Sequence, residues 1–358
     1  MQGLVSFHPI DLEFFDAIIE PLACGEKTNP EKFLETALSA RAIAWEPWRY
    51  KLALEDCLEM LQPPPPPAEG SLWTKVKNRL ESLDFEPDPI AALVGEKIEP
   101  DLHLHGRPFF ITEGSADSVA SSVDEYRAAT APSEAPSLVS DQLTRLDPRL
   151  TGKVAPVHPE QLSPDMAYRR ELLVWLKGIY DLAAAAKEDG SWGPPGERQA
   201  PAAELLPSEL PFRALMLHSR AVPFWIGRDV DGLETICRAA GIDPPSCLSP
   251  AWRPFTRTCE AFPALHESLG YELKLKRDIG VFVLPEDIPK LLEFLNDEGA
   301  RIIQAAARMG EGPTCATLLR KIRECARYAE RHGMGYMEAC GIHPIELPPD
   351  REFETAGG

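Results

Sequence analysis

Three side chains that could bind a metal ion occur close together in the chain, namely Asp101, His103 and His105. Alternate residues of a β-strand point to the same face, so a strand over residues 102–111 would bring the carboxylate and both imidazoles within reach of one ion. This pattern predicts a metal site that could assist catalysis. The alternative interpretation is a strand edge with two solvated imidazoles, because one short motif specifies little.

A second candidate is an anion site formed by Gly310, Gly312 and Thr314 together with Arg308. A glycine-containing turn at the start of a helix offers free backbone N–H groups to a phosphate or carboxylate, and a nearby guanidinium can pair with the same anion. The acidic side chain of Glu311 opposes this function. The alternative interpretation is an ordinary capped helix start.

The helix that follows carries a basic stripe. Its members recur at spacings of three or four residues and are Arg320, Arg323, Arg327 and Arg331. Residues at these spacings share one face of a helix, which predicts a partner-binding surface opposite the apolar face. Two alternatives stay open: the stripe is a solvated face, or it docks onto an acidic segment of the same protein.

The remaining candidates for chemistry match no known signature. His332, Cys340 and His343 lie eight and three residues apart, a spacing that no standard zinc module has, so we interpret them as a core thiol with loop histidines. The glycine-rich nucleotide-binding motifs, the H-E-x-x-H motif and the G-x-S-x-G motif are missing. We therefore expect no cofactor. An enzyme is still possible, because catalytic groups can meet in space without being adjacent in sequence.

Hydrophobic periodicity predicts the elements that must position these residues. A strand at 3–7 leads into a helix that begins at Asp11, and a strand is expected at 102–111. Further helices are predicted at 30–42, 47–61, 72–83, 115–129 and 166–187, with Ser115 or Asp117 as the cap of the fourth.

The last third of the chain has the clearest pattern. We predict a Pro-rich loop at 190–211, strands at 212–218 and 222–226, a helix at 229–240, and a hairpin of strands at 271–276 and 280–284. Helices are then expected at 285–296, 300–309 and 314–331, with Gly299 ending the first and Gly333 the last. These elements predict an α+β fold, rich in helix, with small and mostly antiparallel sheets.

Proline punctuates the chain, with 36 residues in 358, about twice the usual frequency. Five consecutive prolines at 63–67 predict a stiff spacer within 62–70. Residues 130–165 are rich in Pro, Ser and Ala without a regular period, which indicates a linker. We therefore predict an acidic N-terminal α+β domain over 1–129 and a C-terminal α+β domain over 166–345, followed by an acidic tail over 346–358.

Charge points to the kind of partner. The chain has 37 Lys and Arg against 56 Asp and Glu, a net charge of −19, and the first hundred residues alone carry −9. A field of this sign disfavours nucleic acid and favours a basic protein. We expect an acidic protein-binding module, for instance a neutralising partner of a basic protein or toxin. The alternative is a metal-assisted or anion-binding enzyme at the sites above.

Composition also indicates the compartment. The eight cysteines include no C-x-x-C pair, and the first 26 residues contain no Lys or Arg before Lys27. Apolar runs are much shorter than the roughly 20 residues that cross a bilayer. We therefore expect reduced thiols and a cytoplasmic protein with no membrane contact, and the sequence leaves the oligomeric state open.

Overall fold

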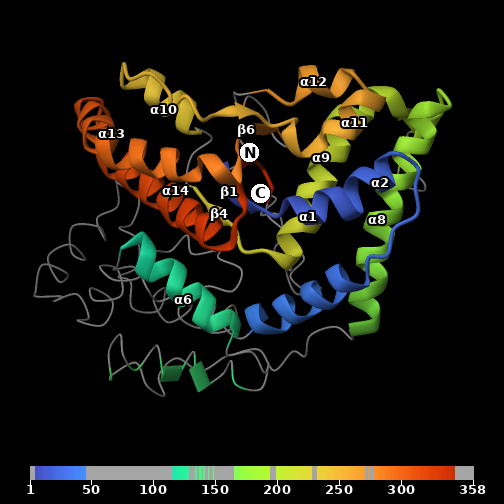
Figure 1. Ribbon diagram of the computed structural model, residues 1–358, viewed down its shortest axis with the longest axis horizontal. Coiled ribbons are helices and arrows are strands. Elements are labelled where there is room, and N and C mark those ends of the chain that lie inside the picture. Colours follow the sequence, from blue (N-terminus) through green and yellow to red (C-terminus); the bar gives the residue numbers. More distant parts are fainter. Residues whose placement is uncertain are drawn as a thin grey trace, which may run out of the picture.

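In the computed structural model, helices surround a small central sheet (Figure 1). The structure describes residues 5–45, 115–128, 165–193, 199–227, 232–270 and 278–342, with isolated positions at 273 and between 134 and 148. No helix within these ranges combines the length and the apolar character needed to cross a membrane. The elements predicted at 47–61, 72–83 and 102–111 lie outside the described residues.

The central sheet has five strands in the order β4-β1-β7-β6-β5, and its pairings are antiparallel. The strands are β1 (Val5–Ile10), β4 (Trp225–Ile226), β5 (Ser249–Pro250), β6 (Ile279–Val283) and β7 (Gly335–Cys340). A separate antiparallel ribbon joins β2 (Ser191–Trp192) to β3 (Ala200–Pro201). The predicted α+β class with small antiparallel sheets is thus confirmed.

Helices make up most of the other described residues. The first part contains α1 (Leu12–Phe14), the π-helical segment η1 (Phe15–Ile19), α2 (Glu20–Ala23), a helical stretch at 31–45, α6 (Ala116–Ala128) and α8 (Asp165–Lys187). The second part contains α9 (Ala202–Ala221), α10 (Leu233–Ala239), η3 (Arg253–Phe255), α11 (Thr256–Ala261), α12 (Ala264–Ser268), η4 (Pro285–Asp287), α13 (Ile288–Arg308) and α14 (Gly312–His332). The helices predicted at 30–42, 115–129, 166–187 and 314–331 are confirmed to within a few residues.

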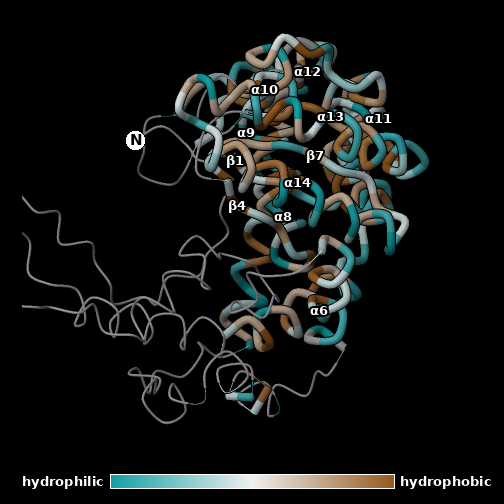
Figure 2. The backbone as a smooth tube through the Cα atoms, turned by 90° about the vertical axis from the view of Figure 1, so that its left-hand side faces the viewer, coloured by the Kyte–Doolittle hydropathy of each residue, from teal (hydrophilic) through white to brown (hydrophobic). Residues whose placement is uncertain are grey.

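The sheet is covered by helices on both faces. Trp225 of β4 packs against Tyr328 of α14, with ring centroids 5.9 Å apart, so α14 lies on one face. Phe7 of β1 is paired with Trp225 and shares that face, while its neighbour His8 points to the opposite face and contacts Ser219 of α9. Hydrophobic stretches accordingly concentrate around the sheet and on the inner sides of the helices (Figure 2).

The first helix begins at Asp11 as predicted, and its middle part is π-helical. Asp11 caps it by accepting a hydrogen bond from the N–H of Glu13 at 3.0 Å. The π-helical segment η1 ends with the N–H of Glu20 donating to the carbonyl of Phe15, just before Pro21. Proline has no N–H to continue an α-helical ladder, which accounts for a local change of hydrogen-bond register at this point.

The loop predicted at 190–211 and the strand predicted at 212–218 are wrong, because α9 runs through Ala202–Ala221. It contains Pro207 and Pro211, residues that normally argue against a helix interior. Their spacing of four means that the missing N–H of Pro211 leaves the carbonyl of Pro207 without its helical donor. Ser268 Oγ donates to that carbonyl at 3.3 Å, and tertiary contacts thus make the helix possible.

The predicted end of a helix at Gly299 is wrong, because the helices predicted at 285–296 and 300–309 form one continuous helix, α13, that runs through Gly299 to Arg308. Gly299 permits a close approach between helices. A Cβ atom at this position would collide with the guanidinium of Arg323 on α14, which donates a hydrogen bond to the carbonyl of Leu295. Gly333 does end α14 as predicted, in the left-handed conformation with φ of 63°.

Strand β7 was not predicted, although it lies at the centre of the sheet between β1 and β6. Gly335 and the buried Glu338 interrupt the apolar pattern that a buried strand normally shows. Strand β6 confirms the prediction at 280–284, but its described neighbours are β5 and β7. Most of the hairpin partner predicted at 271–276 lies outside the described residues.

One hydrophobic core extends through the described residues from Val5 to Ile342. The strand near the N-terminus, β1, pairs with β4 on one side and β7 on the other. The predicted N-terminal domain therefore contributes a central strand to the sheet of the predicted C-terminal domain. The division at 130–165 and the proline-rich linkers stay predictions.

Candidate functional site

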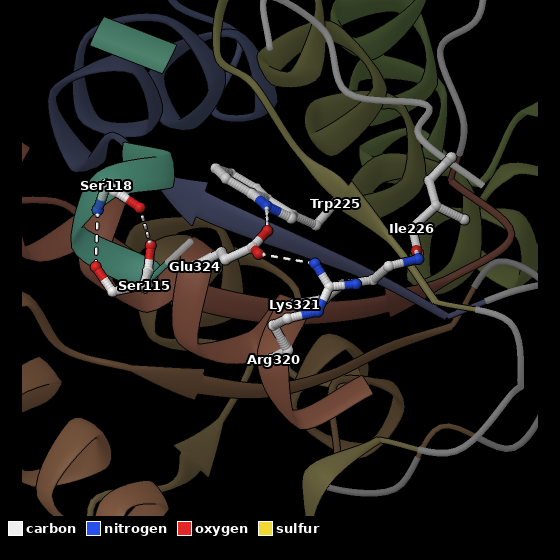
Figure 3. Close-up of polar contacts among 7 residues, drawn as sticks. All are labelled: Ser115, Ser118, Trp225, Ile226, Arg320, Lys321 and Glu324. Carbon is white, nitrogen blue, oxygen red and sulfur yellow. Dashed lines mark hydrogen bonds and ion pairs between the residues drawn. The ribbon is translucent and has the colours of Figure 1, made fainter. Parts of the chain in front are cut away.

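A group of charged side chains, most of them buried, lies between α14 and β4 (Figure 3). Glu324 is fully buried and accepts hydrogen bonds on both carboxylate oxygens. Trp225 Nε1 donates to its Oε2 at 3.0 Å, and Arg320 Nη1 donates to its Oε1 at 3.1 Å. Because residues 320 and 324 are one turn apart on α14, the helix itself places the guanidinium beside the carboxylate.

A buried lysine completes this cluster. Lys321 is 2% exposed and its Nζ donates to the backbone carbonyl of Ile226 at 2.7 Å. Strand β4 is at the edge of the sheet, where carbonyl groups lack a neighbouring strand. The ammonium group therefore covers part of an edge that would otherwise be unpaired. The geometry is that of a structural junction between α14 and the sheet.

A second buried carboxylate, Glu338 of β7, holds the start of α10. The N–H of Leu233 lies 3.0 Å from Oε2 and 3.2 Å from Oε1, and the hydroxyl of Tyr336 donates to Oε1 at 2.8 Å. Burial raises the pKa of Glu338 to about 7, and burial likewise raises the pKa of the neighbouring Cys237 thiol to about 12. The Cys237 thiol is therefore a poor nucleophile.

Glu20 is the third buried carboxylate, between α2 and α11. Its Oε2 accepts a hydrogen bond from the N–H of Thr258 at 2.9 Å, whereas Oε1 is buried without a hydrogen-bond partner. Burial raises the pKa of Glu20 to about 7. A protonated carboxyl at neutral pH fits this apolar surrounding better than a carboxylate does.

Two buried histidines lie where strand β1 meets α9: His8 is on β1 and His218 is on α9. His8 places its Nδ1 3.0 Å from Ser219 Oγ and its Nε2 2.8 Å from Ser6 Oγ. His218 Nε2 accepts from the N–H of Asp11 at 3.1 Å, so its proton is on Nδ1, and burial lowers the pKa of His218 to about 3. A serine beside a histidine can act as a nucleophile, but these side chains are at most 1% exposed.

The predicted metal ligands Asp101, His103 and His105 lie outside the described residues. Within the described ranges, no group of three or more His, Cys, Asp or Glu side chains is arranged to hold a metal ion. The interpretation of Cys340 as a core thiol is confirmed, because it is buried in strand β7. The interpretation of His332 as a loop histidine is wrong, because it is the last residue of α14, where its Nε2 pairs with Asp124 at 2.7 Å. The other member, His343, lies outside the described residues.

The predicted anion site is a tight turn between α13 and α14. Gly310 has a φ of 89° and its N–H donates to the carbonyl of Ala307 at 3.1 Å, while the N–H of Glu311 donates to Ala306 at 2.9 Å. Gly312 is buried against Ala307. Two N–H groups of the turn thus close the preceding helix. Thr314, which begins the predicted helix, lies inside α14, and Arg308 is exposed in the last turn of α13.

The basic stripe of α14 makes contacts within the protein. Arg320 pairs with Glu324 as described, and Arg323 donates to a carbonyl of α13. Arg327 Nε lies 3.4 Å from Asp117 Oδ1, and Arg331 Nη2 lies 2.9 Å from Asp124 Oδ2. Both aspartates belong to α6, so part of the stripe lies against an acidic helix of the same chain (Figure 1).

The predicted cap of α6 lies beside this contact. The Oγ atom of Ser115 accepts a hydrogen bond from the N–H of Ser118 at 3.2 Å, which confirms Ser115 as the cap (Figure 3). Asp117, the other predicted cap, is free to face Arg327. The start of α6 is thereby held where its acidic residues meet α14.

Two exposed surfaces were not identified from the hydrophobic periodicity of the sequence. On α13 the acidic residues Glu286, Glu293 and Asp297, which lie just before and within the helix, are exposed at spacings of seven and four. On α8 the exposed side carries large apolar residues, in addition to the apolar side that faces the core. The signal for the second surface is present in the sequence as apolar residues that lie off the side of α8 buried in the core.

Comparison with protein-family models, with curated proteins and with solved structures finds no match to this chain.

Proposed function

We propose that this chain is an acidic protein-binding module of the cytoplasm that takes a basic protein as its partner, in the manner of a neutralising partner of a basic protein or toxin. The observation that carries the proposal is the outward face of η4 and α13. Glu286, Glu293 and Asp297 are exposed there at helical spacing, and no described residue lies within ion-pair distance of them.

The cations near this face are already engaged. Lys290 pairs with Asp287 at 2.7 Å, and Arg301 pairs with Glu298 at 2.5 Å. The arginines of α14 are directed to α6, to Glu324 and to the backbone of α13. The charges of Glu286, Glu293 and Asp297 are therefore available to a partner. We call these three residues the α13 acidic face.

Charge is the physical basis of the proposed recognition. A net charge of −19 produces a negative field that accelerates encounter with a basic protein and disfavours nucleic acid. Charged groups on an exposed face act mainly on the association rate, and salt screens them over about 8–10 Å. The proposed function therefore implies association that slows as ionic strength rises.

The enzyme alternative has less support. The described carboxylates and histidines with strongly altered pKa values, Glu20, Glu338 and His218, are each at most 1% exposed and serve internal contacts. A catalytic group must reach its substrate. Metal analysis of the purified full chain tests the predicted site at Asp101, His103 and His105, where a stoichiometric metal would favour the enzyme.

The proposed function is tested by capture of partners from native cells on the immobilised full chain. The test variant is Glu286→Gln, Glu293→Gln and Asp297→Asn together. The control variant is Glu188→Gln, Asp189→Asn and Glu204→Gln together. It changes the net charge by the same amount at exposed positions, two of them in the turn between α8 and β2 and one in α9. A basic protein that the wild type and control retain, and that the test variant loses, supports the proposal. Identical capture by all three proteins contradicts it.

A further inference from the structure

Helix α8 exposes large apolar side chains where a surface helix normally carries polar ones. Of the five large apolar residues exposed within the described ranges, four are on this helix: Met166 (74%), Leu173 (42%), Val174 (63%) and Tyr180 (40%). The fifth is Met309, in the turn after α13. Single exposed apolar residues need no explanation, but a set that gathers on one helix does.

These residues lie beside the core-facing side of α8 and extend outward from its edge. The inward side of α8 is already occupied by buried residues: Tyr168, Leu172, Leu176, Ile179, Leu182, Ala183 and Ala186. At 3.6 residues per turn, positions 166, 173 and 180 lie within an arc of about 40°, roughly 120° around the helix from the middle of that buried side. The helix lies at the edge of the molecule, packed on α9 and α2 (Figure 1). Its second apolar side therefore faces outward.

Two cations lie on the same outward side. Arg170 and Lys177 follow Met166 and Leu173 by four residues each, so the row reads Met, Arg, Leu, Lys, Tyr over positions 166, 170, 173, 177 and 180. Arg170 is exposed and has no ion-pair partner among the described residues. Lys177 is 70% exposed and pairs with Asp181 on its own helix. We call this row the α8 seam.

The α8 seam has the size of a helix-binding surface. The fourteen steps from Met166 to Tyr180 correspond to about 21 Å, or about four helical turns. Apolar residues every seven positions, with a second position four residues after each, are the pattern by which one helix packs along another. In this row the second position is occupied by a cation instead of an apolar residue.

The cations decide which helix fits. A second copy of this chain, packed antiparallel about Leu173, would bring Arg170 of one copy toward Lys177 of the other, and a parallel pair would bring identical cations together. Like charges facing one another at a seam disfavour such pairing. A helix with acidic residues beside its apolar row would pair with Arg170 and would compete with Asp181 for Lys177.

We propose that the α8 seam is a docking site for an amphipathic helix of another protein, with Asp or Glu placed opposite Arg170 and Lys177. This surface is separate from the α13 acidic face and has the opposite charge preference. The protein would then hold two different partners, a basic one and one that contributes an acidic helix.

Oxidation of methionine by hydroxyl radicals in the full chain tests this proposal directly. The probe is a 21-residue helical peptide with Leu at heptad positions a and d and Glu at e and g, and the matched peptide has Lys in place of Glu. We expect the Glu peptide to protect Met166 and to bind roughly tenfold more tightly than the Lys peptide. Met309, exposed at 58%, is the internal control and should stay reactive.

Charge reversal provides the decisive comparison. The variant Arg170→Glu with Lys177→Glu should prefer the Lys peptide, and Leu173→Ser with Tyr180→Ser should lose both peptides while keeping the wild-type unfolding midpoint. The triple variant of the α13 acidic face should bind the Glu peptide as the wild type does. This last result separates failure of the α8 proposal from failure of the proposed function.

Several results would overturn the proposal. Equal binding of the two peptides, or binding of neither, would show that the seam does not recognise an acidic helix. Slow oxidation of Met166 in the free chain, at the rate of the buried Met337, would show that the seam is already covered. Sedimentation of a dimer that disappears in the Leu173→Ser and Tyr180→Ser variant would identify a second copy as the occupant.

Discussion

Arg331 of α14 and Asp124 of α6 form an ion pair with 2.9 Å between Nη2 and Oδ2, and the other oxygen of Asp124 lies 2.7 Å from His332 Nε2. Asp124 thus contacts two consecutive residues at the C-terminal end of α14, a helix that begins nearly 190 residues after Asp124 in the chain. Cations near the C-terminus of a helix are themselves favourable, so the pair adds to an existing electrostatic preference.

We expect Asp124→Asn to lower the free energy of unfolding by about 1 kcal/mol, because the pair is only partly buried and partly screened by water. Urea denaturation measures this loss, and hydrogen exchange should show faster opening of α6. Glu125→Gln removes an exposed neighbouring charge and should change stability by less than about 0.5 kcal/mol. Equal effects of the two substitutions would mean that Asp124 does not hold α6.

Glu338 makes stability depend on pH. Its ordinary pKa of 4.5 is raised to about 7 by burial, so between these values the folded protein retains a proton that the unfolded chain has released. The contribution is complete below about pH 4.5 and is lost as the pH rises through 7. Its size is roughly 3 kcal/mol, from the shift in pKa.

Glu338→Gln should therefore flatten the decline in unfolding free energy between pH 4.5 and 7, as measured by urea denaturation at several pH values. Glu20 contributes in the same direction because its pKa is also raised to about 7. The variant Glu20→Gln with Glu338→Gln should therefore show a still smaller decline in unfolding free energy over this pH range. His218 works in the opposite direction below its ordinary pKa of 6.5, but it is present in every variant. An unchanged slope in Glu338→Gln would show that this carboxyl is ionised in the folded protein.

Cleavage within 130–165 should leave the two fragments associated. Limited proteolysis is expected to cut this segment first, because it lacks a regular apolar pattern. The fragments should nevertheless elute together from a sizing column under native conditions, since β1 pairs along its whole length with β7. Fragments that separate without denaturant would support independent domains instead.

Leu292 and Glu293 are adjacent on α13 but have opposite environments, the first buried and the second exposed. Leu292→Ala should cost about 2–5 kcal/mol, as large-to-small substitutions in a packed core do. Glu293→Ala should change stability by no more than roughly 0.5 kcal/mol. Chemical denaturation compares them, and similar small losses would contradict the placement of Leu292 in the core and the packing of α13 against α14.

Local patterns in the sequence predicted the long helices and several of their ends. The helix at 314–331 was recognisable from its apolar face and from Gly333, and Ser115 was recognisable as a cap. The candidate site was predicted less well. The basic stripe of α14 was found, but which of its arginines would meet an acidic helix depended on where α6 lies, and the paired aspartates of α6 are more than 200 residues away in the chain.

The sequence by itself determined the helix-rich α+β composition, the acidic charge and the amphipathic faces, because these depend on residue types and on spacings within a few turns. Tertiary structure decided the pairing of β1 with β7, the helical state of Ala202–Ala221 despite two prolines, and the inward direction of Glu338. Each of these depends on partners far away in the chain. A strand is stabilised by hydrogen bonds to its neighbours, and a buried carboxyl by the donors that surround it, so neither is specified by local periodicity.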